Sequence, residues 1–311
     1  MVISVRVPYN LGERTVMSNY EKTGQIISLN QKRRQKHSMM KKGAAPQSPA
    51  RVIAITSGKG GVGKTNIVAN LGYALCKSGK RVLIFDADLG LGNLDVLLGL
   101  TPPFNLSHVV EGKKKLSEII ISGPGNLKIL PASSGIQELT KLTLAQKLEI
   151  FNELNTLLSD FDIVLIDTAA GISSNVLYFN ASANEIMVVV TPEPTSITDA
   201  YALMKILSVK YQEKHFRLIV NLANNVKEAD EVSRQLCLVA NRFLDISIEY
   251  FGNVLVDDKV KVGVRKQKVV SELAPMTQAS RNFAELAHKL VGSEPMIRRP
   301  ESRPLIWRDI V

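Results

Sequence analysis

Cysteine is scarce in this sequence, which has 311 residues and only two cysteines, Cys76 and Cys237. Each lies inside a helical pattern with no second cysteine nearby, which argues against a disulfide framework and against a cysteine-rich metal site. The four histidines are also scattered, without the spacing of a metal site. A chain without paired cysteines suits a reducing compartment, so we expect a cytoplasmic protein.

Long hydrophobic runs are absent as well. No apolar run approaches ~18 residues, the length that a membrane-spanning helix requires, and the first residues do not follow the pattern of a signal peptide. The sequence therefore predicts neither a membrane span nor export. Its hydrophobic content of 45% is nevertheless ample for a buried core.

Charge is distributed unevenly along the chain. The formal net charge is +10, yet residues 1–50 hold nine of the 39 Lys and Arg and two of the 29 Asp and Glu, which leaves 30 against 27 in the remainder. We therefore divide the chain into a basic, flexible arm over 1–50, an α/β domain over 51–291 and a Pro- and Arg-rich tail over 292–311. The arm could contact an acidic partner, nucleic acid or anionic lipid, or remain a solvated extension.

The most informative motif is Gly-Lys-Gly-Gly-Val-Gly-Lys-Thr at residues 58–65. Its spacing fits the Walker A pattern, in which backbone N–H groups surround the phosphates of a nucleotide. In this pattern Lys64 reaches the outer phosphates and the hydroxyl of Thr65 holds magnesium. The motif assigns these residues to nucleotide binding: Gly58, Lys59, Gly60, Gly61, Val62, Gly63, Lys64, Thr65 and Asn66.

Apolar patterns on both sides of the motif support this interpretation. A short β-branched run over 51–56 predicts a strand entering the turn, and an apolar stripe over 65–77 predicts a helix leaving it. Strand and helix patterns then alternate along the chain, which predicts a doubly wound, mostly parallel α/β sheet with helices on both faces. Further strands are expected at 81–86, 127–131, 163–167, 186–191, 216–221 and 246–251, and helices at 144–158, 196–209, 229–243 and 280–291.

Acidic residues follow two of the predicted strands. Asp86 and Asp167 each end an apolar run, and the carboxyl ends of parallel strands form the edge where ligands bind. We expect Thr65, Asp86 and Asp167 to lie around magnesium, and Asp88 to orient the attacking water. Two alternatives remain at this point: Asp167 could only form a turn, and Asp88 could only cap a helix that begins near Asn93.

Lys59 is not required by a simple phosphate loop. With this lysine, residues 59–65 match the deviant Walker A signature, and the chain here resembles the MinD/ParA class of dimerising ATPases. The resemblance continues through Asp-Ala-Asp-Leu-Gly-Leu-Gly-Asn-Leu-Asp at 86–95 and Asp-Thr-Ala-Ala-Gly-Ile at 167–172, which includes Gly171. It implies that Mg²⁺ and ATP or ADP are bound, that hydrolysis is slow, and that Lys59 reaches the phosphates of a partner protomer in an ATP-dependent homodimer. The expected catalytic residues are then Lys59, Lys64, Asp88 and Asp167.

The same resemblance points to residues on the adenine side of the nucleotide. Asn221 and either Asp257 or Asp258 match the family's polar positions there. The family often has proline where this chain has Leu255, so the backbone on this side of the base differs.

Two later segments resemble the flagellar number regulators called FlhG, FleN or YlxH. These are Glu-Pro-Thr-Ser-Ile-Thr-Asp-Ala-Tyr-Ala-Leu at 193–203 and Arg-Phe-Leu-Asp at 242–245. The resemblance implies control of flagellar number, placement and assembly at the cytoplasmic membrane near the pole. The implied partners are the flagellar GTPase FlhF and either switch-complex proteins or a flagellar transcription activator. The apolar cluster at 305–311 could lie in the lipid interface, or could dock on its own domain.

Related functions remain as alternatives. A ParA-like partition protein would use the basic arm to bind DNA, and a MinD-like protein would position cell division; we expect nucleic acid not to be a partner. Iron–sulfur scaffold ATPases and nitrogenase-type reductases need clustered cysteines, so the two isolated cysteines argue against both.

Overall fold

A computed structural model describes residues 50–88, 93–131 and 152–295. Nearly all of the predicted arm, most of the predicted tail, residues 89–92 after Asp88 and residues 144–151 of a predicted helix lie outside the described residues. No helix among the described residues is both long and apolar enough to cross a membrane.

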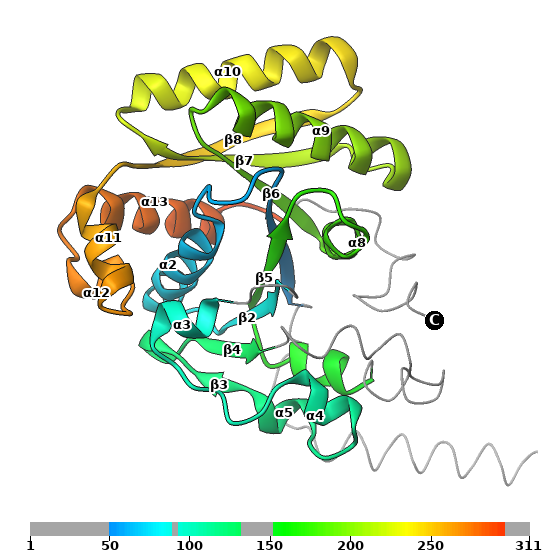
Figure 1. Cartoon of the computed structure of the whole chain (residues 1–311), viewed down its shortest axis with the longest axis vertical. Coiled ribbons are helices and arrows are strands. Elements are labelled where there is room, and N and C mark those ends of the chain that lie inside the picture. The colour runs from blue at the N-terminus through cyan, green and yellow to red at the C-terminus, as the bar shows by residue number, and fades with distance from the viewer. Residues whose placement is uncertain (1–49, 89–92, 132–151, 296–311) are drawn as a thin grey trace, which may run out of the picture. The chain divides into compact units, whose positions relative to one another are not determined.

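Eight strands form one sheet in the order β3-β4-β2-β5-β1-β6-β7-β8, and only the short edge strand β3 runs antiparallel to its neighbour (Figure 1). The central strands are mostly apolar and buried because helices cover both faces of the sheet. Because these strands are parallel, their carboxyl ends lie at one edge of the sheet, as the sequence predicts. The strands are β1 (Arg51–Ser57), β2 (Val82–Ala87), β3 (Ile121–Ser122), β4 (Lys128–Pro131), β5 (Ile163–Ala170), β6 (Glu185–Val190), β7 (His215–Ala223) and β8 (Ser247–Leu255).

The helices divide between the two faces. On one face α2 and α13 pack on the sheet and α12 packs against these two helices, while on the other face α4, α5, residues 152–158, α8, α9 and α10 pack. A short 3₁₀ turn, η1 (Pro124–Asn126), precedes β4. The helices are α2 (Lys64–Lys77), α3 (Leu94–Leu98), α4 (Leu106–Val110), α5 (Leu116–Ile119), α8 (Ser174–Ser182), α9 (Pro194–Tyr211), α10 (Val226–Phe243), α11 (Asp258–Arg265), α12 (Val270–Leu273) and α13 (Gln278–Gly292).

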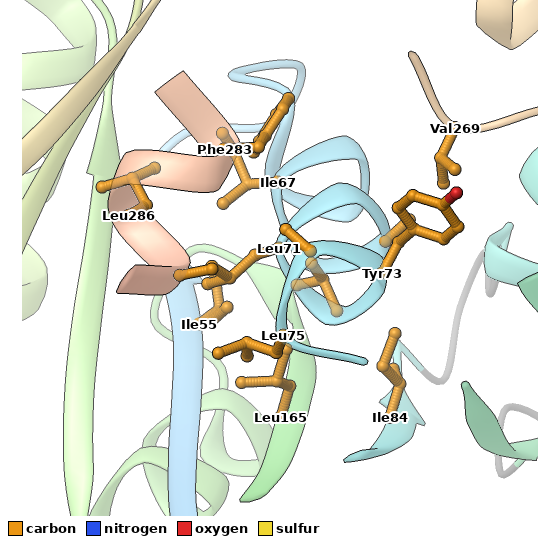
Figure 2. Close-up of a cluster of buried hydrophobic side chains, with 14 of the residues drawn as sticks. Ile55, Ile67, Leu71, Tyr73, Leu75, Ile84, Leu165, Val269, Phe283 and Leu286 are labelled. Atoms are coloured by element: carbon orange, nitrogen blue, oxygen red, sulfur yellow. The ribbon is translucent and has the colours of Figure 1, made fainter. Parts of the chain in front are cut away.

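The helix that follows the glycine-rich turn is fixed by its apolar side chains. Figure 2 shows Ile67, Leu71 and Leu75 of α2 between the sheet and α13, and all three are fully buried or nearly so. Burying one such side chain contributes about 1.5–3 kcal/mol to folding. The sheet and α13 therefore hold α2 firmly, and its first turn is presented to the ligand edge.

The predicted fold class is confirmed, and the main elements lie within a few residues of their predicted bounds. One detail is wrong: Asp167 does not close its strand, because β5 continues to Ala170. The sequence indicates a helix that begins near Asn93, where α3 begins, but it does not predict α4, α5, α8, α11 or α12. Most of these helices are too short to show a helical repeat.

Candidate nucleotide-binding site

The glycine-rich turn joins the end of β1 to the start of α2. Gly63 is the N-cap of α2 and has a left-handed backbone with φ of 87°. No side chain caps this end, so the first backbone N–H groups of the helix remain available to an anion. Lys64 starts the helix, and only 8% of its surface is exposed. This geometry suits the phosphates of a nucleotide.

Gly58 is required by its neighbour α9. A Cβ atom on Gly58 would lie 2.2 Å from the carbonyl carbon and oxygen of Asp199. Both groups are backbone, so neither can rotate away. The turn therefore packs directly on α9, a contact that the motif spacing does not reveal.

We expect Gly58→Ala to destabilise the protein by at least about 2 kcal/mol, because overpacking against backbone forces the elements apart. For a domain of this size that corresponds to a fall in melting temperature of roughly 4–8 °C. Gly60→Ala is the matched control, since no atom lies within 4 Å of its added Cβ. Equal melting temperatures for the two variants in a calorimetric scan would contradict the close contact with α9.

Asn221, near the end of β7, holds the turn from the other side. Its side-chain amide donates a hydrogen bond of 2.8 Å to the carbonyl oxygen of Val62. The same nitrogen lies 2.4 Å from the position that a Cβ on Gly63 would take. Asn221 thus contacts the backbone of the glycine-rich turn, and its predicted contact with the base stays a prediction.

Two buried carboxylates lie side by side below the turn. Asp86 of β2 and Asp167 of β5 are directly paired in the parallel register. Burial and the neighbouring Asp167 raise the pKa of Asp86 to about 7. Burial also raises the pKa of Asp167 to about 6, an increase that Lys64 and the Thr65 hydroxyl oppose. The pair therefore favours a positive ligand.

These shifts give the apo protein a defined pH dependence. In the folded protein the two carboxyls keep their protons up to about pH 6–7, whereas aspartates in the unfolded chain lose theirs near pH 4. The free energy of unfolding therefore falls as pH rises from about 4 to about 7. We expect the free energy of unfolding without nucleotide or metal to fall by roughly 4 kcal/mol between pH 5 and pH 8, since about two pKa units from Asp86 and about one from Asp167 each correspond to about 1.4 kcal/mol. Urea titrations of Asp86→Asn should show a shallower slope, and the surface variant Asp230→Asn the parental slope. An unchanged slope in Asp86→Asn would show that the pair does not cause it.

Magnesium fits the residues beside the turn. Oδ1 of Asp167 is buried and has no hydrogen-bond partner among the described residues, which costs free energy unless a cation or its water shell interacts with this oxygen. The Thr65 hydroxyl interacts with the same carboxylate. A hydroxyl and carboxylate oxygens are the ligands that Mg²⁺ prefers.

Asp88 follows β2 at the same edge. Its backbone N–H donates to Oδ1 of Asp86 at 3.3 Å, which places Asp88 directly after the buried carboxylate pair. The helix that the sequence places nearby is α3, and its N-cap residue is Asn93. Asp88 therefore precedes the N-cap residue of α3, and its role in orienting water stays a prediction.

The other predicted residues are distributed around the turn. Gly171 donates its N–H to the carbonyl of Ser57 at 2.9 Å, which brings the end of β5 against the start of the turn. Asn66 lies in the first turn of α2. Asp257 caps α11 by accepting from Lys259 N at 2.9 Å, and it also accepts from Ala279 N at 3.1 Å. Its carboxylate is thus engaged with backbone amides, and the predicted base contact stays a prediction.

Lys59 points away from its own turn towards the start of α9. Its ammonium donates to Oγ1 of Thr195 at 2.8 Å and forms an ion pair with Glu193. In the sequence these two residues belong to the segment 193–203 that resembles the flagellar regulators, and no role is predicted for either. Nothing in the local sequence indicates the contact, because 134 residues separate Lys59 from Glu193.

Comparisons with known proteins agree with this geometry. Residues 50–219 match the family described as "AAA domain". The chain is 43% identical to the antiactivator FleN of Pseudomonas aeruginosa over 81% of this chain and 90% of that protein. It is 39% identical to the flagellum site-determining protein YlxH of Helicobacter pylori over 77% of this chain and 81% of that protein.

A solved structure shares the fold. The septum site-determining protein MinD of Pyrococcus horikoshii, complexed with Mg-ADP, superposes with a TM-score of 0.63. The two are 25% identical, and the alignment covers 78% of this chain and 96% of that one. With its phosphate loop, strand order and relatives, this chain belongs to the MinD/ParA family of nucleotide-hydrolysing P-loop ATPases.

Proposed function

We propose that this chain is a slow, Mg²⁺-dependent ATPase that dimerises with ATP and regulates flagellar number or placement. The observation that carries the proposal is the 43% identity to the antiactivator FleN, which extends over 90% of that protein. A second relative, YlxH, is described as flagellum site-determining. Because both alignments cover most of each relative, the similarity includes more than the phosphate loop.

The residues around the turn account for hydrolysis in the following way. Lys64 and the first N–H groups of α2 bind the phosphates, while Thr65 and Asp167 hold Mg²⁺ and Asp86 supports its shell. Bound Mg²⁺ neutralises the charge that develops on the phosphates. Asp88 orients the attacking water, and Lys59 of a second copy stabilises the transition state. Asn221, Gly171 and Asp257 complete the nucleotide site, with Asn221 nearest the base.

Exposed apolar side chains support a second copy at this edge. Large apolar residues usually face the core, yet four lie exposed on segments that leave the carboxyl ends of β5, β7 and β8. Such an edge suits a symmetric interface that forms only when nucleotide is bound. The four residues are Ile172 (50% exposed), Leu222 (43%), Val226 (53%) and Val256 (46%).

The proposed cellular setting follows from the flagellar relatives. We infer a cytoplasmic protein that contacts the inner face of the membrane peripherally, at the pole in a polarly flagellated cell. Its partners in this proposal are the GTPase FlhF and either switch-complex proteins or a flagellar transcription activator. In the order of the sequence, the proposed arm over 1–50 precedes the ATPase domain and the proposed tail over 292–311 follows it.

Counting flagella by electron microscopy in a deletion strain tests the proposal. We expect an altered number or placement of flagella, restored by the parent gene but not by a Lys64→Ala copy. Cell length and septum position serve as the second readout, because the similarity to MinD makes division-site positioning the alternative. Normal flagellation with displaced septa would replace the flagellar role by the MinD-like one.

A further inference from the structure

We propose that Glu193 and Thr195 are positioning residues that hold Lys59 within its own chain and thereby limit ATP-dependent dimerisation. The inference rests on the proposed function, because it concerns the lysine that the dimer requires. It adds a restraint on that lysine which the resemblance does not supply.

Lys59 makes this contact with two residues at the start of α9. Lys59 donates to the Thr195 hydroxyl at 2.8 Å and pairs with the Glu193 carboxylate. Glu193 is the N-cap residue of α9, yet its side chain makes no capping hydrogen bond. Its carboxylate therefore serves Lys59 and not the helix that it precedes.

The helix makes this arrangement dependent on Glu193. The N-terminus of a helix carries a partial positive charge, which disfavours an ammonium group beside it. Glu193 compensates that charge and keeps Lys59 in place. Without the carboxylate, Lys59 would lose its ion pair and face the helix dipole, so its side chain would turn into solvent.

The distance between Lys59 and α9 is set by backbone contacts. Gly58 touches the backbone of Asp199, and the Ser196 hydroxyl accepts from the backbone N–H of Thr191 at 3.0 Å. The start of α9 is thus fixed both to the turn and to the end of β6. Glu193 and Thr195 consequently remain within reach of Lys59 whatever the conformation of the exposed side chains.

A partner's triphosphate must compete with Glu193 for one ammonium group. If Lys59 kept the ion pair while it bound the phosphates, the carboxylate would lie close to several negative charges, which is unfavourable. The side chains of Lys59 and Glu193 are 35% and 62% exposed, so the pair is weak and can be displaced. The ion pair between Lys59 and Glu193 therefore weakens dimerisation but does not prevent it. Each pair should weaken the dimer by about threefold, and the two pairs of a symmetric dimer by about tenfold.

Sedimentation velocity with a non-hydrolysable ATP analogue and Mg²⁺ tests the inference. We expect Glu193→Gln to lower the dimer Kd about tenfold, and Thr195→Val to lower it about twofold. The ATP affinity of the monomer should not change, because Lys59 does not face its own phosphates. Glu231→Gln is the matched control: this glutamate also forms an exposed ion pair, with Arg234 on α10.

The outcomes separate this inference from the proposed function. If the parent dimerises and Glu193→Gln has an equal or higher dimer Kd at an unchanged melting temperature, Glu193 does not restrain Lys59 and the inference fails alone. If the parent stays monomeric with the analogue, both fail. The double variant Lys59→Ala/Glu193→Gln should dimerise no better than Lys59→Ala; tighter dimerisation in the double variant would show that Glu193 acts by repulsion and not through Lys59.

Discussion

Lys59→Ala should bind Mg-ATP as a monomer and fail to dimerise. We expect its dimer Kd with a non-hydrolysable analogue to rise more than about 100-fold, because the variant removes one cation from each of two symmetric sites. Its hydrolysis rate should fall by about 10³-fold, the lower end of the range for a cation supplied in trans. Light scattering with ADP and with the analogue measures the first effect, and phosphate release the second.

The nucleotide affinity of the monomer distinguishes this role from damage to the phosphate loop. Lys59→Ala should retain it within about threefold, because the parent side chain points to Glu193 and Thr195 and not to its own turn. Lys205→Ala, which removes an exposed lysine from α9, is the control for charge. A Lys59→Ala protein that dimerises like the parent would exclude the cross-protomer role.

Asp88→Ala should give the opposite result, a dimer that persists. Without a carboxylate to orient the attacking water, we expect single-turnover hydrolysis to slow by about 10²–10⁴-fold. ATP binding and dimerisation should remain, since Lys59, Lys64 and Thr65 are unchanged. Size-exclusion chromatography after incubation with ATP should show the dimer long after the parent has returned to monomer.

A nearby carboxylate provides the control for this variant. Asp95 lies on α3 beyond the loop, and its Oδ1 accepts from the backbone N–H of Val96 at 2.7 Å. Asp95→Asn should hydrolyse ATP at close to the parental rate. Parental hydrolysis by Asp88→Ala would mean that another group orients the water.

Much of the architecture follows from local patterns. The strand over 51–56 and the helix over 65–77 were readable because one is a buried β-branched run and the other has an apolar stripe. The phosphate loop was readable because its glycines and Lys64 occupy fixed positions in a short segment. Short elements such as α4 and α5 were not, since five or four residues cannot display a helical repeat.

The pairing of Asp86 with Asp167 could be predicted only in part from the sequence. The sequence predicted that both lie at the ligand edge, because each follows an apolar run. Only the order of the strands makes them direct neighbours, since β2 pairs with β5 and not with β1. Burial and this neighbour raise the pKa of Asp86, whereas burial raises the pKa of Asp167.

A buried ion-pair network at the opposite edge of the sheet depends on topology in the same way. Glu185 is fully buried and pairs with both Arg51 and Arg217, which begin or lie on neighbouring strands. Arg51 also donates to the carbonyl oxygens of Leu290 at 2.7 Å and Ser293 at 3.0 Å, and so ties the end of α13 to β1. In the sequence these are isolated charges with no indication of a partner.

By itself the sequence determined the chemistry: a phosphate loop, a hydroxyl and carboxylates for a cation, and the alternation that gives a parallel sheet. The tertiary structure decided which groups meet, namely Gly58 with α9, Asn221 with Val62, and Lys59 with Glu193. The physical reason is the distance along the chain over which each kind of interaction acts. Turn and helix preferences act over a few residues, whereas these contacts join positions more than 130 residues apart and exist only once β1, β6 and β7 are adjacent in the sheet.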